Sequence, residues 1–517
     1  MDLTQEVKAW IADDPDPKTA AQLQQWLDSN NEVELRTSFS GFLQFGTAGL
    51  RGPIRPGPSG MNRAVVGRTA AGLAAYMKER NLTSVVIGRD ARYGSEDFTF
   101  ETAQIMSGAG MKVYVLPRPL PTPVLAFATN ELKCDVGIMV TASHNPPQDN
   151  GYKVYLGGTV DGIHYRGSQI VSPTDESIAQ KIDSITSLAS QPRGKEWTVL
   201  GEEVVDKYVG ITAALANKPG NLKIVYTAMH GVGTETLQQV FHKAGFPQPI
   251  LVESQAKPDP DFPTVAFPNP EEPGAIDLAL ETARTFDADL VIANDPDADR
   301  CAAAVKDPVK GWRMLRGDEL GVILGETIAR ATTQGILANS IVSSSILSKI
   351  AAHYKLDFKE TLTGFKWLAK IDGLTFGYEE ALGYAVDAVT VNDKDGISAA
   401  IKLAQIATDL AAQSKTLLDL LDEVWARHGF HATEQISIRL SDLSQVGVIM
   451  GNLRRNSPKE IAGRSVTSID DLAKPKDGLP PTDGLRIWLD GGIRIIIRPS
   501  GTEAKMKCYI EAIAKDS

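Results

Sequence analysis

A repeated alternation of short β-branched runs with stretches of helical apolar spacing constrains this chain more than any other feature. Residues 84–88 form the first such run, a helical pattern follows at 96–108, and a second run occupies 112–116. Another apolar run comes at residues 136–140. Strands and helices that alternate in this way build βαβ units around a mainly parallel sheet. The sequence therefore predicts an α/β fold for this part of the chain.

The same alternation recurs in two later blocks. The second block has strand-like runs at residues 221–227 and 288–293 and helical patterns at 236–244 and 277–286. The third block has strand-like runs at residues 341–345 and 374–378 and helical patterns at 348–354 and 396–413. We therefore predict three α/β blocks with mainly parallel mixed sheets.

The pattern changes after about residue 430. Residues 434–440 alternate as a strand and residues 443–455 have helical spacing. Two further alternating runs, 485–489 and 494–497, flank Asp490-Gly491-Gly492. A glycine-rich turn between two alternating runs is typical of a hairpin. This last block is predicted to be a smaller α+β domain.

At 517 residues the chain is long enough for roughly three or four domains. Polar stretches near residues 191–202, 306–316 and 426–434 are the predicted boundaries. The predicted domains are 1–203, which includes an N-terminal helical extension, then 204–310, 311–428 and 429–517.

Charge and cysteine content exclude several classes of protein. The 53 Lys and Arg against 64 Asp and Glu give a formal charge of −11, which disfavours nucleic acid as a partner. The three cysteines are far apart, so neither a disulfide framework nor a CxxC metal site is expected. Residues 1–20 lack a signal peptide's apolar core, and no apolar run is long enough to cross a membrane. We expect a cytoplasmic protein without a membrane partner.

A polar loop with the sequence TASHNP follows the apolar run at residues 136–140. Open α/β sheets bind ligands at the carboxyl ends of their strands, so Ser143 and the adjacent His144 lie where chemistry is expected. The loop lacks the GxSxG pattern, which disfavours a hydrolase nucleophile. The residue types alone also fit a simple turn or cap.

Three carboxylates follow the next buried run, ADLVIA, in the sequence NDPDADR. Asp295, Asp297 and Asp299 fall on one side of an extended loop because their spacing is i, i+2, i+4. Such a group attracts a hard cation, most plausibly Mg²⁺, since oxygen ligands suit it. A calcium EF-hand is excluded because Arg300 stands where its loop needs glycine. The alternative is a solvated acidic turn.

Other polar loops also follow predicted strands. Arg498, Ser500, Gly501 and Thr502 combine a guanidinium fork, hydroxyls and exposed amides, which suits phosphate, although a plain turn fits as well. Glu379 and Glu380 end a strand and suit sugar hydroxyls or the first turn of a helix. The chain has no GxxxxGK[ST] motif, so a nucleotide-binding function loses support.

Taken together and in order, these motifs resemble those of the α-D-phosphohexomutase superfamily, which includes phosphoglucomutases, phosphomannomutases and a phosphopentomutase-like branch. TASHNP resembles the family's phosphoserine loop, DPDADR its metal loop, YEEALGY its sugar-recognition loop and RPSGTE its phosphate-binding loop. FGTAGLRG and TGFKW are similar to the branch with bacterial phosphoglucomutases and their phosphopentomutase relatives. The resemblance covers nearly the whole chain.

The resemblance implies three α/β domains and a C-terminal α+β domain around a central cleft. It implies a transferable phosphoryl group on Ser143 and one Mg²⁺ per chain, held by Ser143, Asp295, Asp297 and Asp299. It places cationic groups beside the phosphoserine at Arg51 and Lys153, gives proton transfer to Lys153 or Lys394, and adds His144 to the catalytic residues. It assigns substrate binding to Arg300, Thr363, Gly364, Glu379, Arg498, Ser500, Gly501 and Thr502.

The implied function is a phosphoglucomutase that interconverts glucose 1-phosphate and glucose 6-phosphate, activated by glucose 1,6-bisphosphate. Ala381 stands where many phosphoglucomutases have a sugar-binding serine, so mannose or pentose phosphates remain alternatives. A sugar-bisphosphate synthase is another alternative, and a sugar-phosphate-binding regulator is disfavoured because a binder needs no phosphoacceptor beside a metal site. We expect a monomer or a homodimer.

Overall fold

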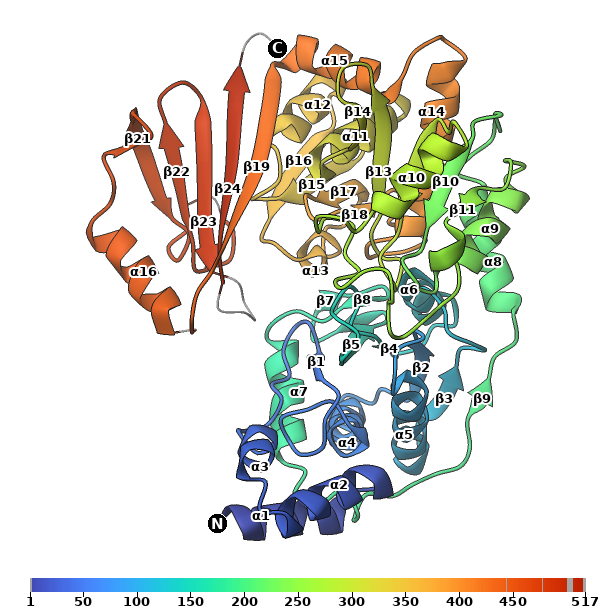
Figure 1. Cartoon of the computed structure of the whole chain (residues 1–517), viewed down its shortest axis with the longest axis vertical. Coiled ribbons are helices and arrows are strands. Elements are labelled where there is room, and N and C mark those ends of the chain that lie inside the picture. The colour runs from blue at the N-terminus through green and yellow to red at the C-terminus, as the bar shows by residue number, and fades with distance from the viewer. Residues whose placement is uncertain (1, 443, 477, 500–504, 515–517) are drawn as a thin grey trace. The chain divides into compact units, whose positions relative to one another are not determined.

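The computed structural model describes residues 2–442, 444–476, 478–499 and 505–514 (Figure 1). The chain forms two compact units. One unit consists of Met1–Leu315 and Gly383–Asp409, and the other of Arg316–Leu382 and Leu410–Ser517. None of the helices in the described ranges combines the length and apolar character that a membrane crossing requires.

The first unit begins with three short helices, which lie in the stretch where we predicted an N-terminal helical extension. They are α1 (Leu3–Asp13), α2 (Pro17–Asp28) and α3 (Glu32–Ser38). Asp16 caps α2 by accepting a hydrogen bond from the Lys18 amide, and proline follows it at the first helical position. Val7, Leu23 and Leu35 form the small core that joins the three helices.

A mixed sheet of seven strands follows, with the order β1-β5-β4-β2-β3-β9 and β8 paired to β5. The strands are β1 (Leu50–Pro53), β2 (Ser84–Arg89), β3 (Lys112–Val115), β4 (Val136–Val140), β5 (Asp149–Leu156), β8 (Ser168–Gln169) and β9 (Thr198–Val199). Strands β4, β2, β3 and β9 are parallel, whereas β5 runs antiparallel to its three partners, β4, β1 and β8. Its helices are α4 (Arg63–Glu79), α5 (Ser95–Gly108), α6 (Thr122–Glu131) and α7 (Thr174–Asp183). Strands β6 (Thr159–Val160) and β7 (Ile163–His164) form a separate hairpin.

The second sheet of this unit has the order β11-β10-β12-β13-β14. Its strands are β10 (Ile224–Thr227), β11 (Ile250–Leu251), β12 (Leu290–Ala293), β13 (Ala302–Asp307) and β14 (Gly311–Met314). The unit also contains α8 (Glu203–Ala213), α9 (Gly233–Lys243), η1 (Glu253–Gln255), α10 (Asp277–Thr285) and β18 (Gly383–Ala385). Residues 311–314, which the sequence placed in a polar boundary stretch, instead form β14 and pair antiparallel with β13. Gly311, with φ +74°, provides the turn between the two strands.

In the second unit, three parallel strands have the order β16-β15-β17. They are β15 (Ile336–Ser340), β16 (Asp357–Thr361) and β17 (Leu374–Glu379). The neighbouring helices are α11 (Gly317–Ala331), α12 (Ile346–Tyr354), α13 (Phe365–Leu368) and α15 (Leu417–His428), while α14 (Gly396–Ala411) begins in the first unit.

The prediction of a strand at residues 341–345 is wrong. The strand is β15, which ends at Ser340, and residues 341–345 form the turn that follows it. The Asn339 side chain donates a 2.7 Å hydrogen bond to the Ser344 carbonyl oxygen, and the Ser343 amide donates to the Ser340 carbonyl oxygen. Local bonds of this kind compete with strand pairing in stretches rich in serine and asparagine.

The C-terminal domain of the second unit is α+β, as predicted. Its antiparallel sheet has the order β19-β24-β23-β22-β21-β20. The elements are β19 (Phe430–Arg439), α16 (Ser444–Arg455), β20 (Glu460–Ile461), β21 (Arg464–Asp471), β22 (Leu485–Leu489), β23 (Ile493–Pro499) and β24 (Lys505–Ala514). The hairpin predicted around Asp490-Gly491-Gly492 joins β22 to β23, and both glycines have positive φ. The fold class is therefore confirmed: α/β with mixed sheets and a smaller C-terminal domain.

Candidate active site

Ser143 lies in a tight turn directly beyond the carboxyl end of β4. Its φ of +53° is in the left-handed region, which side-chain-bearing residues rarely adopt, and its amide donates a 2.9 Å hydrogen bond to Thr141 Oγ1. The side chain is buried, and its hydroxyl donates a 2.8 Å hydrogen bond to Asp295 Oδ2. The turn thus directs the hydroxyl toward the predicted aspartate loop rather than toward solvent.

The aspartate loop follows β12 and brings its three carboxylates together as predicted. One oxygen from each of Asp295, Asp297 and Asp299 lies within 4.8 Å of the other two, and all three residues are buried. Ala298 has φ +53°, and its amide donates to the Asp295 carbonyl oxygen, which closes the loop into a turn. Burial and the two neighbouring carboxylates raise the pKa of Asp295 well above its ordinary value.

Two lysines from distant parts of the chain neutralise this group. Lys153 Nζ, from β5, donates to Asp297 Oδ2 at 2.7 Å and to Asp299 Oδ2 at 3.1 Å. Lys394 Nζ lies 3.3 Å from Asp299 Oδ2. Burial lowers the pKa of Lys153, but the attraction of Asp297 and Asp299 outweighs it and raises the pKa above the ordinary value. Lys153 therefore acts as a fixed positive charge.

The aspartate loop also fits a divalent cation. Among the described residues, neither Asp297 Oδ1 nor Asp299 Oδ1 has a hydrogen-bond partner, although both atoms are buried. A buried carboxylate oxygen without a partner is costly, and three oxygen donors close together suit a hard ion. Asp295, Asp297 and Asp299 are therefore suited to hold Mg²⁺.

Two further predicted residues, His144 and Arg51, contact the serine loop, whereas the Arg300 amide donates a 3.0 Å hydrogen bond to Asp295 Oδ1 and its guanidinium lies 3.6 Å from Glu271. His144 Nδ1 lies 3.1 Å from Ser143 Oγ, and Arg51 Nη1 donates a 3.0 Å hydrogen bond to Asn145 Oδ1 in the same loop. Burial, followed by the charges of Arg300 and Arg51, holds the pKa of His144 well below its ordinary value. The imidazole is therefore neutral near pH 7, and a neutral ring can accept a proton.

Arg92 contacts the serine loop more extensively than any residue that the sequence singled out. Its Nη2 donates to the carbonyl oxygens of Ser143 (2.7 Å) and Asn145 (2.6 Å), and its Nη1 to those of Pro146 (2.8 Å) and Asp149 (3.1 Å). Arg92 follows β2, the strand beside β4, in the sequence GRDAR. The sequence could have indicated Arg92 as a site residue, because it follows the carboxyl end of a parallel strand, where ligands bind.

The predicted sugar and phosphate residues belong to the second unit. Glu379 Oε1 accepts a 2.6 Å hydrogen bond from the Gly364 amide, which brings the two predicted loops together, and Thr363 directly precedes Gly364. Burial raises the pKa of Tyr509, as does the charge of Glu380, whereas the charge of Arg498 lowers it. Arg498 and Glu380 therefore both lie within electrostatic reach of Tyr509. The other predicted phosphate ligands, Ser500, Gly501 and Thr502, lie outside the described residues.

Comparison with protein families finds a match in each part of the chain. The phosphoglucomutase/phosphomannomutase alpha/beta/alpha domains I, II and III match residues 43–189, 204–311 and 316–428. The C-terminal domain of the same family matches residues 450–516.

Individual proteins are similar over most of their length. A Haemophilus influenzae protein named "Probable phosphomannomutase" is 50% identical over 463 residues, covering 88% of this chain and 94% of that protein. The phosphopentomutase of Mus musculus is 34% identical, covering 99% of this chain and 90% of that protein. The open form of the Paramecium phosphoglucomutase parafusin has a TM-score of 0.71 at 18% identity, covering 93% of this chain and 92% of that structure.

Proposed function

The chain belongs to the phosphoglucomutase/phosphomannomutase family and is an intramolecular phosphotransferase, and from that premise we propose that it interconverts the 1- and 6-phosphates of glucose. The phosphoryl-transfer part of this proposal is carried by the 2.8 Å hydrogen bond from Ser143 to Asp295 inside a buried carboxylate group. This serine suits a phosphoacceptor because lysines and arginines surround it.

In the proposed reaction, Ser143 begins as a phosphoserine. A free sugar hydroxyl attacks the phosphorus, the bond from phosphorus to Ser143 Oγ breaks, and a sugar bisphosphate forms. The hydroxyl proton passes to a neighbouring base and from there to the departing Ser143 Oγ. His144 is placed for this transfer because its Nδ1 lies 3.1 Å from Ser143 Oγ, while Lys153 contributes its fixed charge. The bisphosphate then reverses, and Ser143 takes back the other phosphoryl group.

Mg²⁺, held by Asp295, Asp297, Asp299 and the phosphoserine, would neutralise charge on the transferring phosphoryl group. Arg51 and Arg300 add positive charge beside it. Lys394 and Lys153 both pair with Asp299, and Lys394 also adds positive charge there. We assign the sugar hydroxyls to Thr363, Gly364 and Glu379, and the phosphate that is not transferred to Arg498, Ser500, Gly501 and Thr502.

A substrate panel tests this proposal. The enzyme would be assayed with the 1-phosphates of glucose, mannose and ribose, with Mg²⁺ and a catalytic amount of glucose 1,6-bisphosphate. We expect the highest kcat/KM with glucose 1-phosphate and activation by the bisphosphate. A higher value with mannose 1-phosphate would favour the name carried by the Haemophilus relative. No turnover of any sugar phosphate would overturn the proposal.

Three further features belong to the same proposal. We propose a cytoplasmic enzyme that acts as a monomer or a homodimer, which size-exclusion chromatography with light scattering would test. The proposed domain boundaries, 203/204, 310/311 and 428/429, would be tested by limited proteolysis.

A further inference from the structure

The serine-rich turn at residues 340–345 contacts the end of the sugar-loop strand, β17. Ser343 Oγ donates a 3.1 Å hydrogen bond to Glu380 Oε2 and accepts one of 3.1 Å from the Glu380 amide. Ser340 Oγ donates to the same carboxylate oxygen at 3.0 Å. The turn therefore holds both the backbone and the side chain of the residue after Glu379.

A second link joins this turn to the residue before Glu379. The Ser344 amide donates a 2.7 Å hydrogen bond to Asp318 Oδ1, and the Tyr378 hydroxyl donates to the same oxygen at 2.9 Å. Asp318, Ser344 and Tyr378 are all buried. Glu379 is thus flanked on both sides by residues whose position depends on the serine turn.

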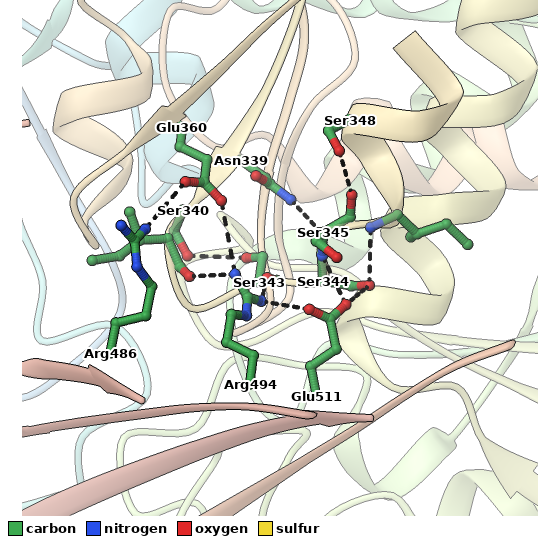
Figure 2. Close-up of polar contacts among 12 residues, drawn as sticks. Asn339, Ser340, Ser343, Ser344, Ser345, Ser348, Glu360, Arg486, Arg494 and Glu511 are labelled. Carbon is green, nitrogen blue, oxygen red and sulfur yellow. Dashed lines mark hydrogen bonds and ion pairs between the residues drawn. The ribbon is translucent and has the colours of Figure 1, made fainter. Parts of the chain in front are cut away.

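The serine turn is held in its own place by the C-terminal domain (Figure 2). Arg494 Nη1 donates to the Ile341 carbonyl oxygen at 3.1 Å, and Arg494 Nη2 donates to the Ser343 carbonyl oxygen at 2.5 Å. Glu511 Oε1 accepts hydrogen bonds from Ser344 Oγ at 2.7 Å and from the Ser345 amide at 2.8 Å. These two side chains satisfy the backbone of a turn that would otherwise expose unpaired polar groups in a buried place.

Arg494 and Glu511 also fix each other. They lie directly opposite in the antiparallel pair of β23 and β24, and Arg494 Nη2 is 2.9 Å from Glu511 Oε2. Only 3% of Arg494 and 2% of Glu511 is exposed, so solvent does not screen the pair. A charged pair held this way has little freedom to move, which suits a positioning role.

Strand β23 connects this pair to the predicted phosphate ligand. Arg494 and Arg498 are four residues apart on the strand, so they lie on the same face. Ile496, between them, packs with Ile341, Val342 and Tyr509 on that face. One strand therefore carries both the residue that clamps the serine turn and Arg498.

We propose that Arg494 is a positioning residue for sugar recognition: through Ser343 it fixes Glu380 and hence Glu379 relative to Arg498. This inference rests on the proposed function, because it assumes that Glu379 contacts the sugar. It gives the C-terminal domain a second task besides phosphate binding, since its Arg494–Glu511 pair sets where the sugar loop lies. Substrate discrimination should then depend on Arg494, although this residue is buried.

The first test is Ser343→Ala, which removes both hydroxyl contacts to Glu380 and leaves the Arg494 contact with the Ser343 backbone intact. Ser348→Ala is the matched control, because among the described residues the Ser348 hydroxyl donates only to the Ser345 carbonyl oxygen, 2.7 Å away at the start of α12. We expect Ser343→Ala to raise KM for the preferred sugar phosphate about tenfold, the effect of losing hydrogen bonds to a charged group. The ratio of kcat/KM between glucose and mannose 1-phosphates should fall with it, whereas Ser348→Ala should leave both values unchanged.

The second test is Arg494→Lys, which keeps the charge but loses the planar fork that reaches two carbonyl oxygens and Glu511. It should change KM and the sugar ratio in the same direction as Ser343→Ala. The double variant should change KM and the sugar ratio by less than the product of the two single effects, because both substitutions weaken the same chain of contacts from Arg494 through Ser343 to Glu380.

These outcomes separate the inference from the function on which it rests. A change in kcat alone, with KM and the sugar ratio unaltered in both single variants, would mean that the serine turn serves stability only, and the inference would be overturned. Multiplicative effects in the double variant would also overturn it. A wild-type enzyme inactive on every sugar phosphate would overturn the proposed function and the inference together.

Discussion

Ser143 Oγ and Asp295 Oδ2 lie 2.8 Å apart in a buried hydrogen bond, although 152 residues separate them in the chain. The two residues belong to loops that follow β4 and β12, strands of two different sheets. Both loops turn through a residue with positive φ, Ser143 in one and Ala298 in the other. The packing of two α/β domains within one unit thus creates the contact from which the mechanism follows.

Ser143→Ala should abolish turnover. The variant has no oxygen to carry the phosphoryl group, and the loss of one buried hydroxyl should leave the fold intact. Intact-mass spectrometry after incubation with glucose 1,6-bisphosphate should show one added phosphoryl group on the wild type and none on the variant. Ser184→Ala, at an exposed serine, is the control. Normal activity of Ser143→Ala would exclude the phosphoserine mechanism.

Chelation of divalent metal should abolish turnover, and added Mg²⁺ should restore it. Asp297→Asn should weaken Mg²⁺ binding about 100-fold, because even the substitution of a residue that only supports a metal ligand can lower metal affinity by that factor. Calorimetric titration with Mg²⁺ measures this directly, and Asp287→Asn, at an exposed surface ion pair, is the control. An Asp297→Asn protein with wild-type Mg²⁺ affinity would show that the aspartates do not bind the metal.

Arg92→Lys should slow phosphorylation of Ser143 about 10- to 100-fold. Lysine retains the charge, but one ammonium group cannot reach four carbonyl oxygens with the geometry of the guanidinium fork. The serine loop would then lose the support that holds Ser143 at its strained φ. The rate of phosphoryl incorporation from glucose 1,6-bisphosphate is the measurement, with Arg89→Lys, which pairs with Glu96 instead, as the control. Equal rates in both variants would contradict this role.

Arg498→Ala should raise KM and release more bisphosphate per turnover. On our proposal Arg498 binds the phosphate that is not being transferred, so its loss weakens the hold on the intermediate while it reverses. Ser143 should still be phosphorylated by excess glucose 1,6-bisphosphate, and Arg498→Lys should restore KM only in part. Unchanged KM and unchanged bisphosphate release would remove Arg498 from the phosphate site.

The buried carboxylate of Glu511 predicts a pH-dependent stability. Burial raises its pKa, but hydrogen bonds from His431 and Ser344 and the charge of Arg494 outweigh this and lower the pKa to about 2. Because the pKa is lower in the folded protein, the carboxylate's contribution to the free energy of unfolding is complete well above its ordinary pKa of 4.5 and is lost as pH falls toward 2.

Glu511→Gln should therefore destabilise the protein by about 3 kcal/mol at pH 7. The difference from the wild type should shrink as pH falls below about 4.5. Urea unfolding of both proteins between pH 7 and pH 3 measures it. A difference that stayed constant over this range would show that the charge of Glu511 contributes nothing.

Much of this architecture could be predicted from the sequence because its strands and helices have clear local periodicity. Strand β4 and the loop with Ser143 were predicted from an apolar run followed by polar residues, and so were β12 and the aspartates. Residues 341–345 were predicted as a strand because two β-branched residues, Ile341 and Val342, begin this run of otherwise small residues. Their turn depends on the Asn339 side chain and on Arg494, which no local pattern shows.

The site residues that the sequence missed or left open depend on tertiary contacts. Arg92 holds the serine loop through carbonyl oxygens more than 50 residues away, and Thr122 donates a 2.6 Å hydrogen bond to Asp297. Lys394 was predicted only as one of two candidates for proton transfer, and the structure brings it next to Asp299. Side-chain contacts over such separations leave no periodic signal in the chain.

The return of residues 383–409 to the first unit has a consequence for how the protein is made. The chain leaves the first unit after Leu315, comes back to it at Gly383 and leaves again after Asp409. During synthesis the ribosome must therefore release part of the second unit before the first can be finished, so the two cannot mature strictly one after the other. A nascent chain that stops at Leu315 lacks Lys394, and Asp299 then has Lys153 but not its second cation. No single split of the gene separates the two units into intact halves.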